Sequence, residues 1–160
     1  MDEFDKRILR LVQQSNRLTS EQLSEEVGLS ATACQKRLKR LRESGVIVAD
    51  VAIVDPVKIG RSLTLVVGVR LVGQSEKLLA KFTARMQEAP EVQQCYFVTG
   101  EDDCILIVSA RDIAEYRAFC SRYFVKNPNV TNFLTRVVTE QVKMTTAFPV
   151  VPSENQPEAG

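Results

Sequence analysis

Basic side chains gather in one short stretch of this 160-residue chain. The stretch is SATACQKRLKRLRESG, residues 30–45, where five cations face the single carboxylate of Glu43: Lys36, Arg37, Lys39, Arg40 and Arg42. The formal net charge of the chain is only +1, so a surface for an anionic polymer has to be local. Cations of this kind suit nucleic-acid phosphates, and the hydroxyl of Thr32 and the amide of Gln35 suit the edges of bases.

The element that must position these side chains is a helix. Ser30 can cap its N-terminus through the hydroxyl, and Gly45 can end it in the left-handed conformation. Cys34, Leu38 and Leu41 fall on one face, with Gln35 and Arg40 on the flanks. The opposite face carries four polar residues: Thr32, Lys36, Lys39 and Glu43. Such a helix fits the major groove of DNA, although the solvated basic face of an ordinary amphipathic helix has the same pattern.

The segments before this helix favour the DNA-binding interpretation. Residues 2–17 predict a first helix, with acidic residues near its start and an apolar stripe at helical spacing. Thr19 and Gln22 form a capping box for a short second helix, which Gly28 ends. A short helix, a glycine turn and a capped basic helix follow one another as in a helix-turn-helix.

A change of pattern after residue 45 predicts the end of the first domain. The stretch VIVADVAIVD is β-branched and interrupted by Asp50, which predicts the two strands of a small hairpin or wing. The proline and glycine that follow mark a break. We expect a winged helix-turn-helix domain over residues 1–54 and a linker over residues 55–62.

From residue 63 onward the expected elements follow the order βαββαβ. The strands are expected over residues 63–72, 92–99, 104–109 and 130–144, and the helices over residues 75–88 and 112–124. This order predicts an α+β protein with a ferredoxin-like domain over residues 63–148. Both helices then lie on one face of the sheet, so its other apolar face must be covered, most simply by a second copy. Residues 149–160 are rich in proline and glutamate and are expected to be disordered.

The turn between the second and third of these strands could bind a small molecule. It contains a threonine, a glycine and three carboxylates: Thr99, Gly100, Glu101, Asp102 and Asp103. Gly100 lets backbone N–H groups approach a ligand carboxylate, and Asp103 could accept hydrogen bonds from an ammonium group. An amino acid would supply both groups, but a tight solvated hairpin turn has a similar composition.

Other chemistries find less support in the sequence. The chain has no histidine, and its four cysteines form no CxxC pair, so we expect no structural zinc site and no cofactor. Cysteines in apolar segments are expected to be reduced and buried. We find no phosphate loop and no nucleophile motif, and Asp102 and Asp103 are adjacent, which suits paired acid–base catalysis poorly; an enzyme is not expected. The chain shows no targeting segment and no long apolar span, so we expect a cytoplasmic protein that does not use a membrane.

A series of short motifs runs in order along residues 2–149. The motifs are Asp2-x-x-Asp5, Asn16-Arg17, Glu21-Gln22-Leu23-Ser24, Gly28-Leu29-Ser30, Gly45-Val46-Ile47, Val98-Thr99-Gly100-x-x-Asp103 and Val142-Lys143. In this order and spacing they resemble the leucine-responsive regulatory protein/asparagine-operon regulator family (Lrp/AsnC, or feast/famine regulators). The resemblance implies a transcription regulator that binds double-stranded DNA through its first domain and a small effector, typically an amino acid, through its second. It also implies homodimers that assemble further, up to octamers.

The resemblance assigns roles to residues of the basic helix. The recognition helix covers residues 30–43, beginning at Ser30, and three of its side chains are placed to reach bases: Thr32, Gln35 and Lys36. Lys39 and Arg40 are expected to contact phosphates. Arg37 matches a family arginine but lies near the packed face, so a structural or phosphate-binding role is expected as much as base reading.

The resemblance also places the effector site around the turn at residues 99–103. Thr135 and Val137 on the last strand are expected to complete it from a neighbouring dimer. Asp102 stands where the family often has an uncharged or aromatic residue, so it either favours a cationic ligand or faces solvent. An alternative function, a DNA-organising oligomer without a ligand, shares every feature except this turn.

Overall fold

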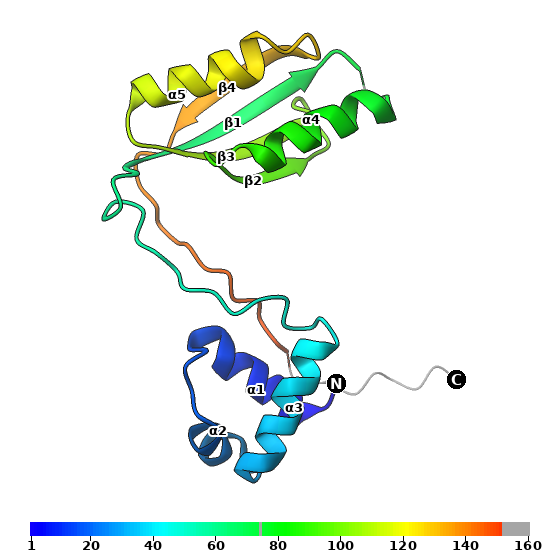
Figure 1. The fold of residues 1–160 in the computed structure, drawn as a ribbon, viewed down its shortest axis with the longest axis vertical. Coiled ribbons are helices and arrows are strands. Elements are labelled where there is room, and N and C mark those ends of the chain that lie inside the picture. The colour runs from blue at the N-terminus through cyan, green and yellow to red at the C-terminus, as the bar shows by residue number, and fades with distance from the viewer. Residues whose placement is uncertain (74, 152–160) are drawn as a thin grey trace. The chain divides into compact units, whose positions relative to one another are not determined.

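The computed structural model describes residues 1–73 and 75–151. The chain divides into two compact units, one of residues 1–53 with the segment that begins at Lys143, and one of residues 54–142. Helices α1 to α3 form the first unit, and a sheet with helices α4 and α5 forms the second (Figure 1). Each unit has its own apolar core, and the predicted α+β fold class is confirmed.

The first unit consists of three capped helices, α1 (Glu3–Gln14), α2 (Ser20–Val27) and α3 (Ala31–Glu43). The capping box predicted for α2 is confirmed, since Thr19 accepts from the backbone N–H of Gln22 and Gln22 accepts from that of Thr19. Gly28 turns the chain between α2 and α3 with a φ of 78°, a conformation that favours glycine. The Ser30 hydroxyl accepts from the backbone N–H of Ala33 at 3.2 Å and caps α3 as expected.

A small apolar core holds the three helices together. It is made of six buried side chains: Ile8, Leu9, Leu23, Val27, Cys34 and Leu41. Leu38 packs against this core, so the predicted apolar face of α3 is confirmed. Val150 also packs against it, and Phe148 exchanges two backbone-to-side-chain hydrogen bonds with Gln13, of 2.7 and 3.1 Å. The sequence analysis placed Phe148 at the end of the second domain and Val150 in the tail after it, whereas both lie in the first unit. Residues 152–160, most of the expected disordered tail, lie outside the described residues.

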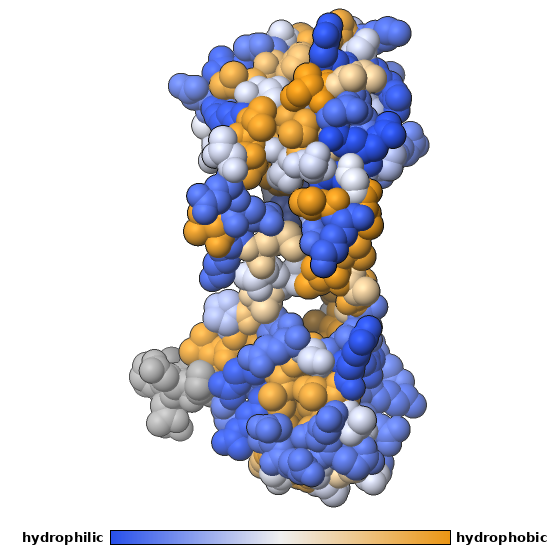
Figure 2. Space-filling view, turned by 90° about the vertical axis from the view of Figure 1, so that its left-hand side faces the viewer, coloured by the Kyte–Doolittle hydropathy of each residue, from blue (hydrophilic) through white to orange (hydrophobic). Residues whose placement is uncertain are grey.

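The hairpin predicted after the basic helix does not form. Among the described residues, 46–62 contain no strand, and Asp50 instead pairs with Arg42 of α3 at 2.9 Å. Ile47 is half-buried against the first core, but most other apolar side chains of this segment are exposed, up to 91% for Val48. Figure 2 shows hydrophobic surface along the extended segments. A two-stranded hairpin without further strands or a helix to pack on is marginal in water, which explains the difference.

The second unit is a four-stranded antiparallel sheet with the order β2-β3-β1-β4, which confirms the ferredoxin-like arrangement. Its elements are β1 (Leu63–Leu71), α4 (Glu76–Glu88), β2 (Val92–Phe97), β3 (Cys104–Ala110), α5 (Ile113–Cys120), a π-helical turn (Ser121–Val125) and β4 (Val130–Val137). The last strand is shorter than the predicted 130–144. Its partner β1 pairs with it only as far as Leu65, and the backbone bond from Val138 to Thr64 ends the ladder.

Side chains alternate between the two faces of this sheet, as strand geometry requires. Leu65, Val67 and Val69 of β1 face α4 and α5, which lie over the same side (Figure 1), and pack in one core with aromatic residues of both helices. On the opposite face, Tyr96 and Leu134 are 53% and 52% exposed. The sequence prediction of an open apolar face agrees with this arrangement. No helix among the described residues is long and apolar enough to cross a membrane.

Candidate DNA-binding and effector sites

The outer face of α3 presents polar side chains that the fold leaves accessible. Thr32, Gln35 and Lys36 are exposed, and none of the three makes a side-chain hydrogen bond or ion pair with the described part of the chain. Lys39 is also exposed, and its ammonium lies 3.6 Å from the Glu43 carboxylate. An exposed pair of this kind is weak and can be exchanged for another anion. The face therefore offers two exposed cations, an amide and a hydroxyl along the outer side of the helix.

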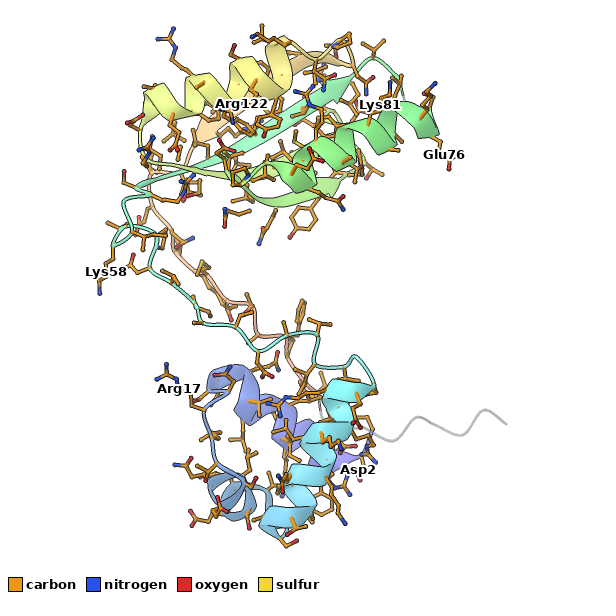
Figure 3. All side chains as sticks on the ribbon, in the orientation of Figure 1. Asp2, Arg17, Lys58, Glu76, Lys81 and Arg122 are labelled. Carbon is orange, nitrogen blue, oxygen red and sulfur yellow. The ribbon has the colours of Figure 1, made fainter. Side chains whose placement is uncertain are left out.

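Arg37 and Arg40 behave differently, because both are engaged by α1. Arg37 Nη1 lies 2.7 Å from an Asp2 oxygen and 2.8 Å from an Asp5 oxygen, and Arg40 Nη2 lies 2.7 Å from Asp5. The Arg37 guanidinium also lies 5.5 Å from the centre of the Phe4 ring. We call these four charged residues, Asp2, Asp5, Arg37 and Arg40, the α1–α3 clamp; Asp2 lies beside α3 in Figure 3.

The clamp joins a helix cap to the basic helix. Asp2 caps α1 and accepts from the backbone N–H of Asp5, and this bond, with help from Arg37, holds the pKa of Asp2 below its ordinary value. The hydrogen bonds to Asp5 and Asp2 raise the pKa of Arg37. Asp5 is only 1% exposed, so its charge needs these partners. The sequence analysis missed the clamp, although Asp2-x-x-Asp5 and Arg37-x-x-Arg40 share a spacing that places each pair on one helix face. The phosphate contact expected of Arg40 has to compete with its bond to Asp5.

The turn at residues 99–103 is docked on the end of β1. Gly100 has a φ of 125°, in the region that favours glycine. The backbone N–H of Asp103 donates to Val69 at 3.0 Å, and its carboxylate accepts from the backbone N–H of Leu71 at 2.8 Å. Asp103 thus has a structural role that the sequence did not indicate. The other residues of the turn, Thr99, Gly100 and Glu101, are exposed.

Asp102 lies back over the open face of the sheet. A Cβ built on Gly68 in the middle of β1 would lie 2.2 Å from Asp102 Oδ2, so only glycine leaves room for this carboxylate. Asp102 Oδ1 lies 3.9 Å from Arg70 Nε, and Glu101 lies 3.4 Å from the same guanidinium. With 19% of its side chain exposed, Asp102 is neither a solvated turn residue nor an isolated charge. The glycine that permits the closest approach is Gly68, which the sequence analysis did not single out.

Thr135 and Val137 lie apart from this turn within one chain. Thr135 faces the helices, where its hydroxyl hydrogen-bonds to the hydroxyl of Tyr116. Val137 pairs with Leu65, near the end of β1 opposite to Leu71, and is 50% exposed. A site that combines these residues with the turn would need a second chain, as the sequence-based expectation also required.

Two family models match the chain. Residues 64–148 match the Lrp/AsnC ligand binding domain, and residues 1–48 match a winged helix-turn-helix DNA-binding domain. The second match ends before most of the segment where the wing hairpin was expected.

Full-length relatives agree with these matches. The chain is 47% identical over 150 residues to the uncharacterized HTH-type transcriptional regulator y4tD of Sinorhizobium fredii, covering 94% of this chain and 89% of that protein. The crystal structure of an AsnC family transcriptional regulator from Agrobacterium tumefaciens has a TM-score of 0.89 at 37% identity, covering 94% of this chain and 97% of that one. The transcriptional regulator NMB0573 from Neisseria meningitidis, in complex with L-Met, has a TM-score of 0.89 at 29% identity, with coverage of 94% and 97%.

Proposed function

Because this chain belongs to the Lrp/AsnC family of DNA-binding transcription regulators, we propose that it controls transcription in response to an amino acid bound by its second unit. The observation that supports DNA reading most directly is the outer face of α3, whose Thr32, Gln35 and Lys36 have no partner among the described residues. Side chains placed in this way can give all of their hydrogen-bonding capacity to a ligand. The relatives named above are transcription regulators rather than enzymes.

In this proposal α3 lies in the major groove with its first turns against the bases. The Gln35 amide suits adenine, Lys36 suits guanine, and the Thr32 hydroxyl serves either. Lys39 contacts the phosphate backbone, and Ser30 orients the helix N-terminus through its cap. Arg40 contributes to phosphate binding only through the side of its guanidinium that does not face Asp5.

Substitutions on α3 test this arrangement. Gln35→Ala or Lys36→Ala should change the sequence preference. Each good hydrogen-bonded contact to a base that is lost should weaken binding by about 1–3 kcal/mol. Lys39→Ala should weaken binding to all sequences and reduce the salt dependence, because one phosphate interaction disappears. Lys81→Ala is the matched control, since it removes an exposed cation from α4 in the other unit. The proposal fails if the three α3 variants bind a cognate promoter fragment as the control does.

The effector in this proposal is held at the turn of residues 99–103. Its carboxylate accepts from backbone N–H groups around Gly100, and its ammonium donates to Asp103, which the bond from Leu71 holds in place. The similar regulator from Neisseria meningitidis, solved with L-Met, supports an amino acid as the ligand class. Thr135 and Val137 of a chain in a neighbouring dimer complete the site, so the ligand changes the balance between assembly states.

The test begins with a thermal-shift screen of the amino acids on the purified full chain. Asp103→Asn then removes the charge but keeps an oxygen that can accept from Leu71. We expect this variant to lose the effector response in a DNA-binding titration and to keep its basal DNA affinity, because α3 folds in the other unit. Glu76→Gln is the control, since it removes an exposed carboxylate from α4 of the same unit, outside the turn, and it should keep the wild-type effector response. A wild-type effector midpoint for Asp103→Asn would place the effector elsewhere, and a screen without a ligand would favour the DNA-organising oligomer.

The proposal includes assembly through the open face of the sheet. The exposed apolar side chains of Tyr96 and Leu134, with half-buried neighbours such as Ile107, form a face that a second copy can cover. A dimer of this kind would present two α3 helices to two half-sites on double-stranded DNA. We expect the protein to work in the cytoplasm, where bacterial DNA lies.

A further inference from the structure

Two cysteine side chains meet across the β2–β3 hairpin. Cys95 of β2 and Cys104 of β3 have their sulfur atoms 3.4 Å apart, and both thiols are free. Cys95 is opposite Leu106 in the register and Cys104 is opposite Phe97, so the two cysteines are diagonal neighbours on the helix-covered face. No element of the proposed function uses this pair.

The distance between the sulfur atoms is short enough for a small movement to join them. A disulfide bond is about 2.0 Å long, so the two atoms would have to approach by about 1.4 Å. Strand β2 is an edge strand that pairs with β3 alone, and its pairing has an irregularity between Val92 and Gln94. An edge strand of this kind can shift without breaking a second ladder.

The two thiols differ in reactivity. The hydrogen bond between them lowers the pKa of Cys95 and raises that of Cys104, and burial further raises the pKa of Cys104. Of the two thiols, Cys95 therefore loses its proton more readily, and it is half-buried whereas Cys104 is fully buried. The thiolate is the reactive form of cysteine, so Cys95 is the group that meets an oxidant.

The other two cysteines lack such an arrangement. Cys34 is fully buried in the core of the first unit. Cys120 is buried in α5 near Tyr116, and burial raises its pKa. Neither has a cysteine sulfur within hydrogen-bonding distance among the described residues, so both are suitable controls.

We propose that Cys95 and Cys104 form a reversible oxidation site that a hydroperoxide converts to an intramolecular disulfide. The Cys95 thiolate attacks the outer oxygen of the hydroperoxide, the O–O bond breaks, and the leaving oxygen takes a proton from solvent to become an alcohol or water. Cys95 is then a sulfenic acid. The sulfur of Cys104 attacks it, the S–O bond breaks, and hydroxide leaves with the Cys104 proton as water. In total two thiols lose two protons and two electrons, and one hydroperoxide is reduced.

The disulfide would fix the base of the hairpin that carries the turn at residues 99–103. Cys95 and Cys104 flank this turn, so the covalent link closes a short loop around it and restricts its motion. Oxidation is then expected to change the affinity for an effector at the turn. That consequence rests on the proposed function, whereas the formation of the disulfide does not.

The experiment treats the reduced full chain with hydrogen peroxide and maps peptides by mass spectrometry without reduction. The wild type should lose two free thiols and the mass of two hydrogen atoms, form the Cys95–Cys104 cross-linked peptide, and recover with dithiothreitol. Cys34→Ala and Cys120→Ser should behave in the same way. Cys95→Ser should leave Cys104 reduced. Cys104→Ala should accumulate a sulfenic acid on Cys95 that dimedone traps, and this variant tests the pair even if Cys95→Ser folds poorly.

Two results would overturn the proposal. One is oxidation that joins Cys95 or Cys104 to another cysteine or to a second chain. The other is oxidation of Cys34 and Cys120 as readily as Cys95. If the disulfide forms and slows hydrogen exchange at residues 98–103 but leaves effector affinity unchanged, the oxidation site stands and the effector site at the turn is wrong.

Discussion

Asp5 is the residue through which the α1–α3 clamp can be tested most directly. Its carboxylate is buried and accepts from Arg37 at 2.8 Å, from Arg40 at 2.7 Å and from the backbone N–H of Asp2 at 3.2 Å. Asp5→Ala removes all of these bonds at once. Arg37 keeps Asp2 as a partner, and the Arg40 side chain is 61% exposed, so neither guanidinium is left buried without compensation.

The expected loss follows from these bonds. Charge-assisted hydrogen bonds contribute about 1.5–3 kcal/mol each, and breaking a partly buried pair costs less than the roughly 3–5 kcal/mol of a fully buried one. With the weakened helix cap included, we expect Asp5→Ala to lower the free energy of unfolding of the first unit by about 2–4 kcal/mol. The matched control is Asp50→Ala, which removes an exposed carboxylate from Arg42 of α3 and should cost about 0–1 kcal/mol.

Hydrogen exchange read by mass spectrometry separates the two units within the intact chain. The most protected peptides of α1 and α3 should exchange roughly 30- to 1,000-fold faster in Asp5→Ala, and at most about 5-fold faster in Asp50→Ala. The free energy of unfolding of the wild-type first unit sets the upper limit of this acceleration. Peptides of the β1–β4 sheet should not change, because they belong to the other unit. If the two variants have equal effects on α1 and α3, the clamp does not stabilise the fold, and Arg37 and Arg40 are available to DNA phosphates.

Three further predictions follow from particular interactions. The pKa of Asp2 is lowered in the folded chain, so its stabilising contribution should be complete above its ordinary value of 3.8 and lost as the pH falls through the folded value; denaturation of the first unit followed between about pH 5 and pH 2 should show a flatter profile for Asp2→Asn. Gly68→Ala should displace Asp102 and speed hydrogen exchange at residues 98–103. The double variant Gly68→Ala/Asp102→Ala should reverse most of that effect, and a wild-type exchange rate in Gly68→Ala would contradict the close approach. Light scattering at micromolar concentration should give a dimer or larger for the wild type and a smaller species for Leu134→Asp, and a wild-type monomer would contradict assembly through the open face. The two α3 helices of a dimer should occupy two DNA half-sites about 10 bp or a multiple apart.

The sequence alone predicted the features that depend on near neighbours in the chain. The caps of Thr19 and Ser30, the turn at Gly28 and the apolar face of α3 all involve residues a few positions apart, so their chemistry can be read from spacing. The order of strands and helices in the second unit was predictable for the same reason. This order restricts the sheet to few topologies, and the ferredoxin-like arrangement is one of them.

Tertiary structure alone decided which distant residues meet. Local periodicity contains no information on the pairing of Asp5 with Arg37 and Arg40, of Asp103 with Leu71, or of Cys95 with Cys104. Strand ends also depend on partners. The β-branched segment after α3 has no partner strand within the described chain and remains extended, and β4 ends where β1 stops pairing with it. A strand needs hydrogen bonds from a neighbour that can lie far away in sequence, whereas a helix supplies its own, so the helices were predicted more closely than the strands.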